Sequence, residues 1–130
     1  MRTGRPLMSV QILLVDPDPQ RATDLSAPLQ HAGFTVTRSS EFQDAMQLVR
    51  STPPDLVITN VRLGAYNGLH LIMRARAEHP QIAAIAMTAS HDPVLEADAA
   101  SFGAEYTVAP WKDPRPFVEL VSRLASAEPV

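Results

Sequence analysis

Short apolar runs alternate with longer segments of helical period along this chain. Five runs have the length of strands: Gln11–Val15, Phe34–Thr37, Leu56–Thr59, Ile82–Met87 and Tyr106–Val108. The first, third and fourth runs are continuous rather than alternating in hydrophobicity, which is typical of central strands covered on both faces. The pattern therefore predicts five strands, with these three inside a sheet.

The segments between the runs carry apolar residues at helical spacing. Apolar side chains recur at i, i+3, i+4 and i+7 in two stretches, 42–49 and 117–124. This spacing puts them on one side of a helix, so each stretch is predicted to pack one face onto the sheet. The residues concerned are Phe42, Ala45, Met46 and Val49, and then Phe117, Leu120, Val121 and Leu124.

Several helix starts are marked by residues that favour the N-terminal end of a helix. Asp18, Asp92 and Asp113 each precede a proline. An aspartate there offers an N-cap acceptor, and the proline takes the first helical position, where its missing N–H costs nothing. Ser40 with Gln43 has the form of a capping box, which predicts another helix start.

Turns and helix ends have signals of their own. Asn67 precedes Gly68 in a strong turn signal, with Asn67 free to cap the third helix. Gly33 and Gly103 suit the left-handed conformation that often ends a helix. Pro28 lies inside the predicted first helix, where it is expected to remove a hydrogen bond and to kink or shorten the helix.

The order of elements is a strand followed by a helix, repeated five times. Such alternation predicts an α/β fold with a parallel sheet and helices on both of its faces, connected by right-handed crossovers. Ligands of such folds bind beyond the carboxyl ends of the strands. The segments to examine for function are therefore 16–18, 60–67, 88–90 and 109–111.

Composition and charge narrow the class of protein. The chain has 130 residues, which is the usual size of one domain. A net charge of −3 argues against a nucleic-acid binder, which normally shows a basic face. The absence of cysteine excludes disulfides and thiol chemistry. No apolar run approaches the roughly 18 residues that cross a membrane. We expect a cytoplasmic protein with no membrane or nucleic-acid contact.

The domain organisation follows from the same pattern. Residues 1–9 are predicted to be a flexible leader, within which Met8 offers an alternative start. Residues 10–127 form one domain, and no output domain is expected. The four histidines lack ligand spacing with a carboxylate, so no metal site is predicted.

Five fragments in order carry a resemblance to a known family. They are 12–16, 55–63, 67–68, 87–89 and 106–111. Together they resemble the receiver domain of two-component response regulators, over about residues 10–127. The resemblance implies a flavodoxin-like (βα)5 fold with strand order 2-1-3-4-5. It also implies signalling by phosphoryl transfer from a phosphohistidine to an aspartate.

That chemistry needs a carboxylate nucleophile, a magnesium ion held by further carboxylates, a hydroxyl donor and a lysine. Matched residue by residue, Asn60 stands at the acceptor position, Pro17 at the second acid and Ala109 at the lysine. Asp16 matches the first acid, and Thr88 keeps the hydroxyl. We therefore predict no catalytic residue, no cofactor, and weak or absent Mg²⁺ binding.

Other interpretations of the retained residues stay open. Asp16 is expected either to bind metal or to accept N–H bonds from its loop. Asp18 either turns inward to replace the missing acid or caps the first helix. The Thr88 hydroxyl either takes part in switching or only forms hydrogen bonds with backbone groups at the end of its strand. Asn60, taken alone, is also the residue that an engineered substitution of the acceptor would introduce.

The predicted function is that of a pseudo-receiver that acts through protein–protein contact. Receivers usually act through the face made by helix four, strand five and helix five. Tyr106 matches the aromatic that responds to phosphorylation there, and Trp111 extends that edge. The partner is expected to be another signalling protein or a second copy of the chain.

Two alternatives belong to other functional classes. The altered pocket near Asn60, Arg62 and Thr88 is a candidate sensor site for an anion or metabolite. A hydrolase on the same frame ranks last, because the chain shows no nucleophile–base pair or cofactor fingerprint.

Overall fold

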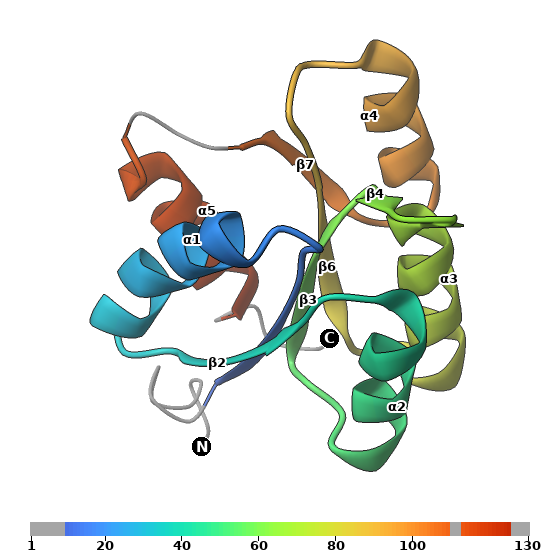
Figure 1. Ribbon diagram of the computed structural model, residues 1–130, viewed down its shortest axis with the longest axis horizontal. Coiled ribbons are helices and arrows are strands. Elements are labelled where there is room, and N and C mark those ends of the chain that lie inside the picture. Colours follow the sequence, from blue (N-terminus) through green and yellow to red (C-terminus); the bar gives the residue numbers. More distant parts are fainter. Residues whose placement is uncertain (1–9, 110–112, 126–130) are drawn as a thin grey trace.

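A five-stranded parallel sheet forms the centre of the molecule (Figure 1). The structure is a computed structural model and describes residues 10–109 and 113–125. The strand order is β2-β1-β3-β6-β7, in which β6 and β7 are the fourth and fifth strands of the predicted sheet, so the predicted order is confirmed. The strands are β1 (Gln11–Val15), β2 (Thr35–Ser39), β3 (Leu56–Asn60), β6 (Ala83–Thr88) and β7 (Glu105–Val108).

Helices cover both faces of this sheet, as the alternating pattern predicted (Figure 1). Helices α1 and α5 share a buried cluster on one face, and α2, α3 and α4 pack on the other. No helix within the described ranges is both long and apolar enough to span a bilayer. The bounds are α1 (Pro19–His31), α2 (Phe42–Ser51), α3 (Gly68–Glu78), α4 (Pro93–Ser101) and α5 (Arg115–Ala125).

Strand β1 shows why the central runs are continuously apolar. Ile12 and Leu14 belong to the cluster with α1 and α5, whereas Leu13 and Val15 belong to the cluster with α2 and α3. Side chains alternate between the faces of a strand, so burial on both faces requires an apolar residue at every position.

The observed strands differ from the predicted runs at a few ends. β2 covers Thr35–Ser39 rather than Phe34–Thr37, because its pairing with β1 continues to the Val15–Ser39 pair. β2 is an edge strand, so polar residues that a hydrophobicity pattern passes over are tolerated in it. A short antiparallel hairpin, β4 (Arg62–Leu63) and β5 (Tyr66–Asn67), was not predicted.

The aspartate caps are confirmed for two helices. The Asp18 carboxylate accepts from the backbone N–H groups of Gln20 and Arg21, and Asp92 caps α4 in the same way. Asn67 caps α3 by accepting from the Leu69 N–H at 2.7 Å. Asp113 accepts from the Arg115 N–H, although α5 begins one residue later than predicted.

Both predicted helix-ending glycines have positive φ. The angles are 103° at Gly33 and 75° at Gly103, in the region that glycine adopts without a steric penalty. Gly64 also has a positive φ of 62°, and it forms the turn of the unpredicted hairpin.

One prediction about a helix end was wrong, and one of the two outcomes expected at Pro28 does not occur. The Ser40–Gln43 capping box does not form, because α2 starts at Phe42 after an N-cap without a side-chain bond. Asp44 instead accepts a hydrogen bond from Ser39 at 2.8 Å. Pro28 does not shorten α1, which continues to His31. Burial of the flanking Leu25 and Leu29 holds the helix across that position.

Candidate functional site

Polar side chains gather in a hollow at the carboxyl ends of the central strands. Asn60 ends β3 and Thr88 ends β6, and both are largely buried. The hollow has a volume of about 680 Å³. Its lining residues are Pro17, Arg21, Asn60, Val61, Arg62, Gly64, Tyr66, Asn67, Thr88, Ala89 and Leu95. Among these described residues none is acidic.

The first retained acid is held by an arginine. The Arg21 guanidinium donates from Nε to Asp16 Oδ2 at 2.6 Å and from Nη2 to Asp16 Oδ1 at 2.7 Å. The Asp18 backbone N–H donates to the same Asp16 Oδ1 at 2.9 Å. The Asp16 side chain is fully buried, so its charge is compensated within the protein rather than by water.

The electrostatics of this pair follow from its geometry. Hydrogen bonding to Asp16 raises the pKa of the Arg21 guanidinium above its ordinary value, while partial burial opposes this rise. Asp18 adds a weaker attraction, with its Oδ2 atom 3.9 Å from Arg21 Nη1. Asp18 is engaged as the cap of α1, which agrees with the second of the two interpretations considered for it.

The residue that the resemblance matches to the acceptor position is fixed by its own loop. Asn60 is 8% exposed, and its Oδ1 atom accepts from the Arg62 backbone N–H at 2.9 Å. Gly68 packs directly against it: a Cβ at Gly68 would lie 2.2 Å from the Asn60 carbonyl oxygen. The Gly68 N–H also donates to the Val61 carbonyl at 2.7 Å. The start of α3 therefore holds Asn60 closely, and only glycine allows that approach.

Thr88 and Tyr106 are joined to each other. Their hydroxyl groups form a short hydrogen bond, and the Thr88 hydroxyl also lies 2.8 Å from the Ser90 carbonyl oxygen. The Asp92 N–H donates to the Tyr106 hydroxyl at 3.0 Å. Tyr106 thus links β7 to the end of β6 and to the start of α4. The Thr88 hydroxyl is committed to these contacts rather than pointing freely into the hollow.

The residue that the resemblance matches to the lysine position is part of the hydrophobic core. Ala109 is buried in the cluster with α1 and α5, and its N–H donates to the Thr88 carbonyl at 2.9 Å. A methyl group here supplies no charge to the hollow. The predicted interface role of Trp111 concerns a residue outside the described ranges.

Magnesium, which the fold family implies, does not fit the residues present. Mg²⁺ needs hard oxygen ligands in a close octahedron, at about 2.1 Å. Pro17 and Asn60 provide no carboxylate, and both oxygens of Asp16 accept hydrogen bonds from Arg21. Within the described ranges no three histidine, cysteine or acidic side chains form a cluster that could hold a metal ion.

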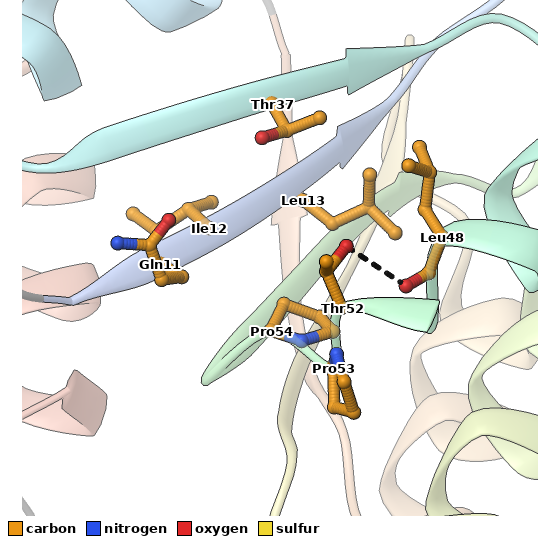
Figure 2. Close-up of a pocket in the computed structure, with 8 residues that line it drawn as sticks. All are labelled: Gln11, Ile12, Leu13, Thr37, Leu48, Thr52, Pro53 and Pro54. Atoms are coloured by element: carbon orange, nitrogen blue, oxygen red, sulfur yellow. Dashed lines mark hydrogen bonds between the residues drawn. The ribbon is translucent and has the colours of Figure 1, made fainter. Parts of the chain in front are cut away.

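A second hollow lies near the opposite ends of the strands (Figure 2). Its volume is about 420 Å³, and it sits between β1, β2 and the segment that follows α2. The hydrogen bond drawn there joins the Thr52 hydroxyl to the Leu48 carbonyl at 3.3 Å. None of its described lining residues carries a charge. The side chains able to do chemistry are thus concentrated at the carboxyl ends.

Arg21 is the site residue that sequence reasoning missed. The spacing offered a usable signal, since an arginine three positions after the Asp18 cap lies in the first helical turn, next to the end of β1. Tyr66 was also missed, because the hairpin that carries it was not predicted. Its ring stacks on Phe42 with centroids 4.8 Å apart.

Comparison with known proteins identifies the family to which this fold belongs. The model of the response regulator receiver domain family matches residues 12–121. The chain belongs to this receiver domain family. It is similar to the DNA-binding response regulator MtrA of Mycolicibacterium smegmatis, with 33% identity over 119 residues, covering 90% of this chain and 50% of MtrA. It is also similar to the transcriptional regulatory protein ZraR of Escherichia coli K12, with 30% identity, covering 78% of this chain and 23% of ZraR.

Solved structures give the same result for the receiver fold. A response regulator from Thermotoga maritima superposes with a TM-score of 0.82 and 26% identity, covering 91% of this chain and 98% of that one. A CheY-like receiver domain protein from Methanospirillum hungatei superposes with a TM-score of 0.81 at 20% identity, covering 88% and 91%. The receiver chain spans half or less of the curated relatives MtrA and ZraR.

Proposed function

We propose that this receiver domain signals through protein–protein contact and is not phosphorylated at the usual position. The observation that carries the proposal is the side chain at the acceptor position. Asn60 has an amide there, and its oxygen accepts a hydrogen bond from the Arg62 N–H. An amide has no ionised oxygen to attack phosphorus, so an acyl phosphate requires prior loss of the amide nitrogen.

Two further positions support the same function. Phosphoryl transfer depends on cations that offset the charge on the equatorial oxygens. The lysine position holds the buried methyl group of Ala109, and the second acid is Pro17. A change limited to Asn60, as in an engineered acceptor variant, would leave these two residues unexplained. We therefore attribute the substitutions at all three positions to the natural sequence of the domain rather than to engineering.

Contact is assigned to the face made by α4, β7 and α5. In α4, all of whose residues are described, Ala99 is the one buried residue, and Val94 is 67% exposed. Tyr106 accepts a hydrogen bond from the Asp92 N–H at the start of this helix, which supports a face positioned by contacts within the domain. Trp111 is assigned to the same edge, although it lies outside the described ranges.

The partner is another signalling protein or a second copy of the domain. Neither nucleic acid nor membrane is proposed as a partner of this domain, since the net charge of −3 supplies no basic excess for either. The domain is assigned to residues 10–127, and the cytoplasm is its proposed location.

Phosphorylation is tested by incubating the protein with acetyl phosphate and Mg²⁺ and measuring its intact mass. Wild-type protein is expected to gain no phosphoryl group. The Asn60→Asp variant is the matched control, because it restores the nucleophile while Pro17 and Ala109 remain. A stoichiometric phosphoryl adduct on wild-type protein would overturn the proposal.

Contact is tested separately, by capture of partners and by sedimentation of the purified domain. Val94→Glu and Trp111→Ala are expected to weaken association, whereas Met73→Glu, on the exposed surface of α3, serves as the control. Association that survives both interface variants and is lost in the control would move the interface to α3.

A second candidate function is the sensing of a small anion in the strand-end hollow. The observation that favours it is Arg62, which lines the hollow and whose guanidinium has no ion-pair or hydrogen-bond partner in the described part of the chain. Phosphate is the probe. A saturable thermal stabilisation that is lost in Arg62→Gln and weakened in Thr88→Ala supports this function. Arg50→Gln is the control, because its arginine pairs with Glu78, and it should keep the wild-type stabilisation. A loss in Arg50→Gln equal to that in Arg62→Gln would reduce the response to a general salt effect.

A further inference from the structure

We propose that Arg21 is a permanent internal counter-ion, which takes the place of a divalent cation at Asp16 and closes the hollow to metal. A counter-ion role for Arg21 goes beyond the proposed function, because it concerns what stabilises the pocket rather than what the domain contacts. The observation behind it is the disagreement between the residues present and the magnesium ion that the fold family implies.

The geometry is that of a two-point pair. Arg21 presents Nε and Nη2 to the two oxygens of Asp16, at 2.6 and 2.7 Å. Such parallel bonds are the preferred arrangement of a guanidinium with a carboxylate, and a lysine cannot reproduce them. The Asp18 N–H adds a third donor to Oδ1. A cation that approached either oxygen would therefore meet the positive charge of the Arg21 guanidinium, directly against a side chain that is fully buried.

The local sequence places Arg21 there. Asp18 caps α1 and Pro19 opens it, so the first turn of the helix lies against the end of β1. The Arg21 backbone N–H donates to Asp18 Oδ1 at 3.1 Å, which fixes the backbone as well as the side chain. The cap and the ion pair therefore share one short segment, residues 16–21.

Burial makes the pairing necessary. The Asp16 side chain is fully buried, whereas that of Arg21 is 26% exposed. A buried carboxylate without a counter-charge is strongly unfavourable, so some cation has to accompany Asp16. A domain with an open metal site obtains that cation from solution. Here it is part of the chain, and the folded pocket needs no metal.

Binding of Mn²⁺ and Mg²⁺ tests this role, with thermal melting and titration calorimetry as the readouts. Wild-type protein is expected to show no change of melting temperature with either ion and no measurable heat of binding. Arg21→Met is expected to melt at a lower temperature and to recover part of the loss when Mn²⁺ is added. It should bind Mn²⁺ at least about tenfold more tightly than wild type, because Asp16 becomes available as a ligand.

Two further variants separate the counter-ion role from simple packing. Asp16→Asn with Arg21→Met removes both charges, and is expected to be more stable than Arg21→Met alone and insensitive to Mn²⁺. Arg38→Met removes an exposed arginine that bonds the Thr23 hydroxyl, and should respond to metal like wild type. If Arg21→Met does not fold, the Mn²⁺ titrations of wild type and of the double variant still test the proposal, which requires that neither protein binds the ion.

Submillimolar Mn²⁺ binding by wild-type protein that is lost in the double variant would overturn the proposal. So would a folded Arg21→Met variant that is neither destabilised nor rescued by Mn²⁺. Metal binding and phosphoryl transfer are measured separately, so this inference and the proposed function can fail independently.

Discussion

The two sides of the strand-end hollow are closed by different kinds of interaction. On the β1 side, a buried carboxylate is paired with a guanidinium, between Asp16 and Arg21. On the β6–β7 side, two neutral hydroxyl groups are joined, between Thr88 and Tyr106. The first closure keeps a charge inside the protein, whereas the second only satisfies polar groups. The ionic side is therefore expected to be the more sensitive to substitution.

The largest expected effect is on the ionic side. A double-mutant cycle between Asp16→Asn and Arg21→Met should give a coupling energy of about 2–3 kcal/mol, since each single change leaves a charge without its partner. The value is expected below the range for fully buried pairs, because Arg21 is partly exposed to water. Urea unfolding of the four proteins measures it. Additive changes would show that the pair is only a packing contact.

A substitution at Gly68, which lies between the two sides, is expected to have the second-largest effect on stability. Gly68→Ala places a methyl group against the Asn60 carbonyl, where the start of α3 would have to move away from β3. We expect a loss of about 2 kcal/mol in the free energy of unfolding, as for other overpacked sites. Gly64→Ala, where nothing lies within 4 Å but φ is positive, is the control for backbone strain alone. An equal loss in both variants would contradict the close approach at Gly68.

The neutral side should give a smaller coupling. A cycle between Thr88→Val and Tyr106→Phe is expected to yield about 1 kcal/mol, the usual net value of a hydrogen bond without charge. Tyr106→Phe also leaves the Asp92 N–H without its acceptor, so hydrogen exchange at that amide should accelerate. A coupling as large as that of the ionic pair would remove the contrast between the two sides.

The smallest effect is expected at an exposed ion pair outside the hollow. A side-chain hydrogen bond from Arg115 is the main cause that lowers the pKa of Asp113 below its ordinary value of 3.8. The folded carboxylate therefore holds its proton less tightly than the unfolded one. Its contribution to stability is present above pH 3.8 and is lost as the pH falls through the lowered pKa.

Asp113→Asn tests this contribution while keeping a side-chain acceptor for the Arg115 N–H. The variant should be slightly less stable than wild type at neutral pH, and the two unfolding curves should converge in acid. A difference that does not change with pH would assign the effect to the cap rather than to the charge.

Much of the fold could be predicted from the sequence, because its signals are local. Continuous apolar runs such as Leu56–Thr59 and caps such as Asp92 depend on neighbours in the chain, and the structure confirms them. The β4–β5 hairpin was missed because its two-residue strands are too short to show a period. Helix α1 passes Pro28 because tertiary packing outweighs a local preference.

The candidate site was predicted in position but not in its contacts. Asn60, Pro17 and Ala109 could be matched to family positions, yet their proposed roles stay predictions. The pairing of Asp16 with Arg21 was not foreseen, since the direction of a side chain depends on how α1 docks on the sheet. The link between Thr88 and Tyr106 likewise joins residues that are 18 positions apart.

The central claim is that the strand-end hollow accepts no phosphoryl group at Asn60 and binds no metal ion. Nuclear magnetic resonance of ¹⁵N-labelled protein tests it most directly, with Mg²⁺ and beryllofluoride, a mimic of the phosphoryl group on aspartate, added together. We predict that the amide signals of Asn60, Thr88 and Tyr106 do not shift beyond those of the Arg50 control position. Saturable shifts at these residues, lost when Mg²⁺ is omitted, would contradict the account.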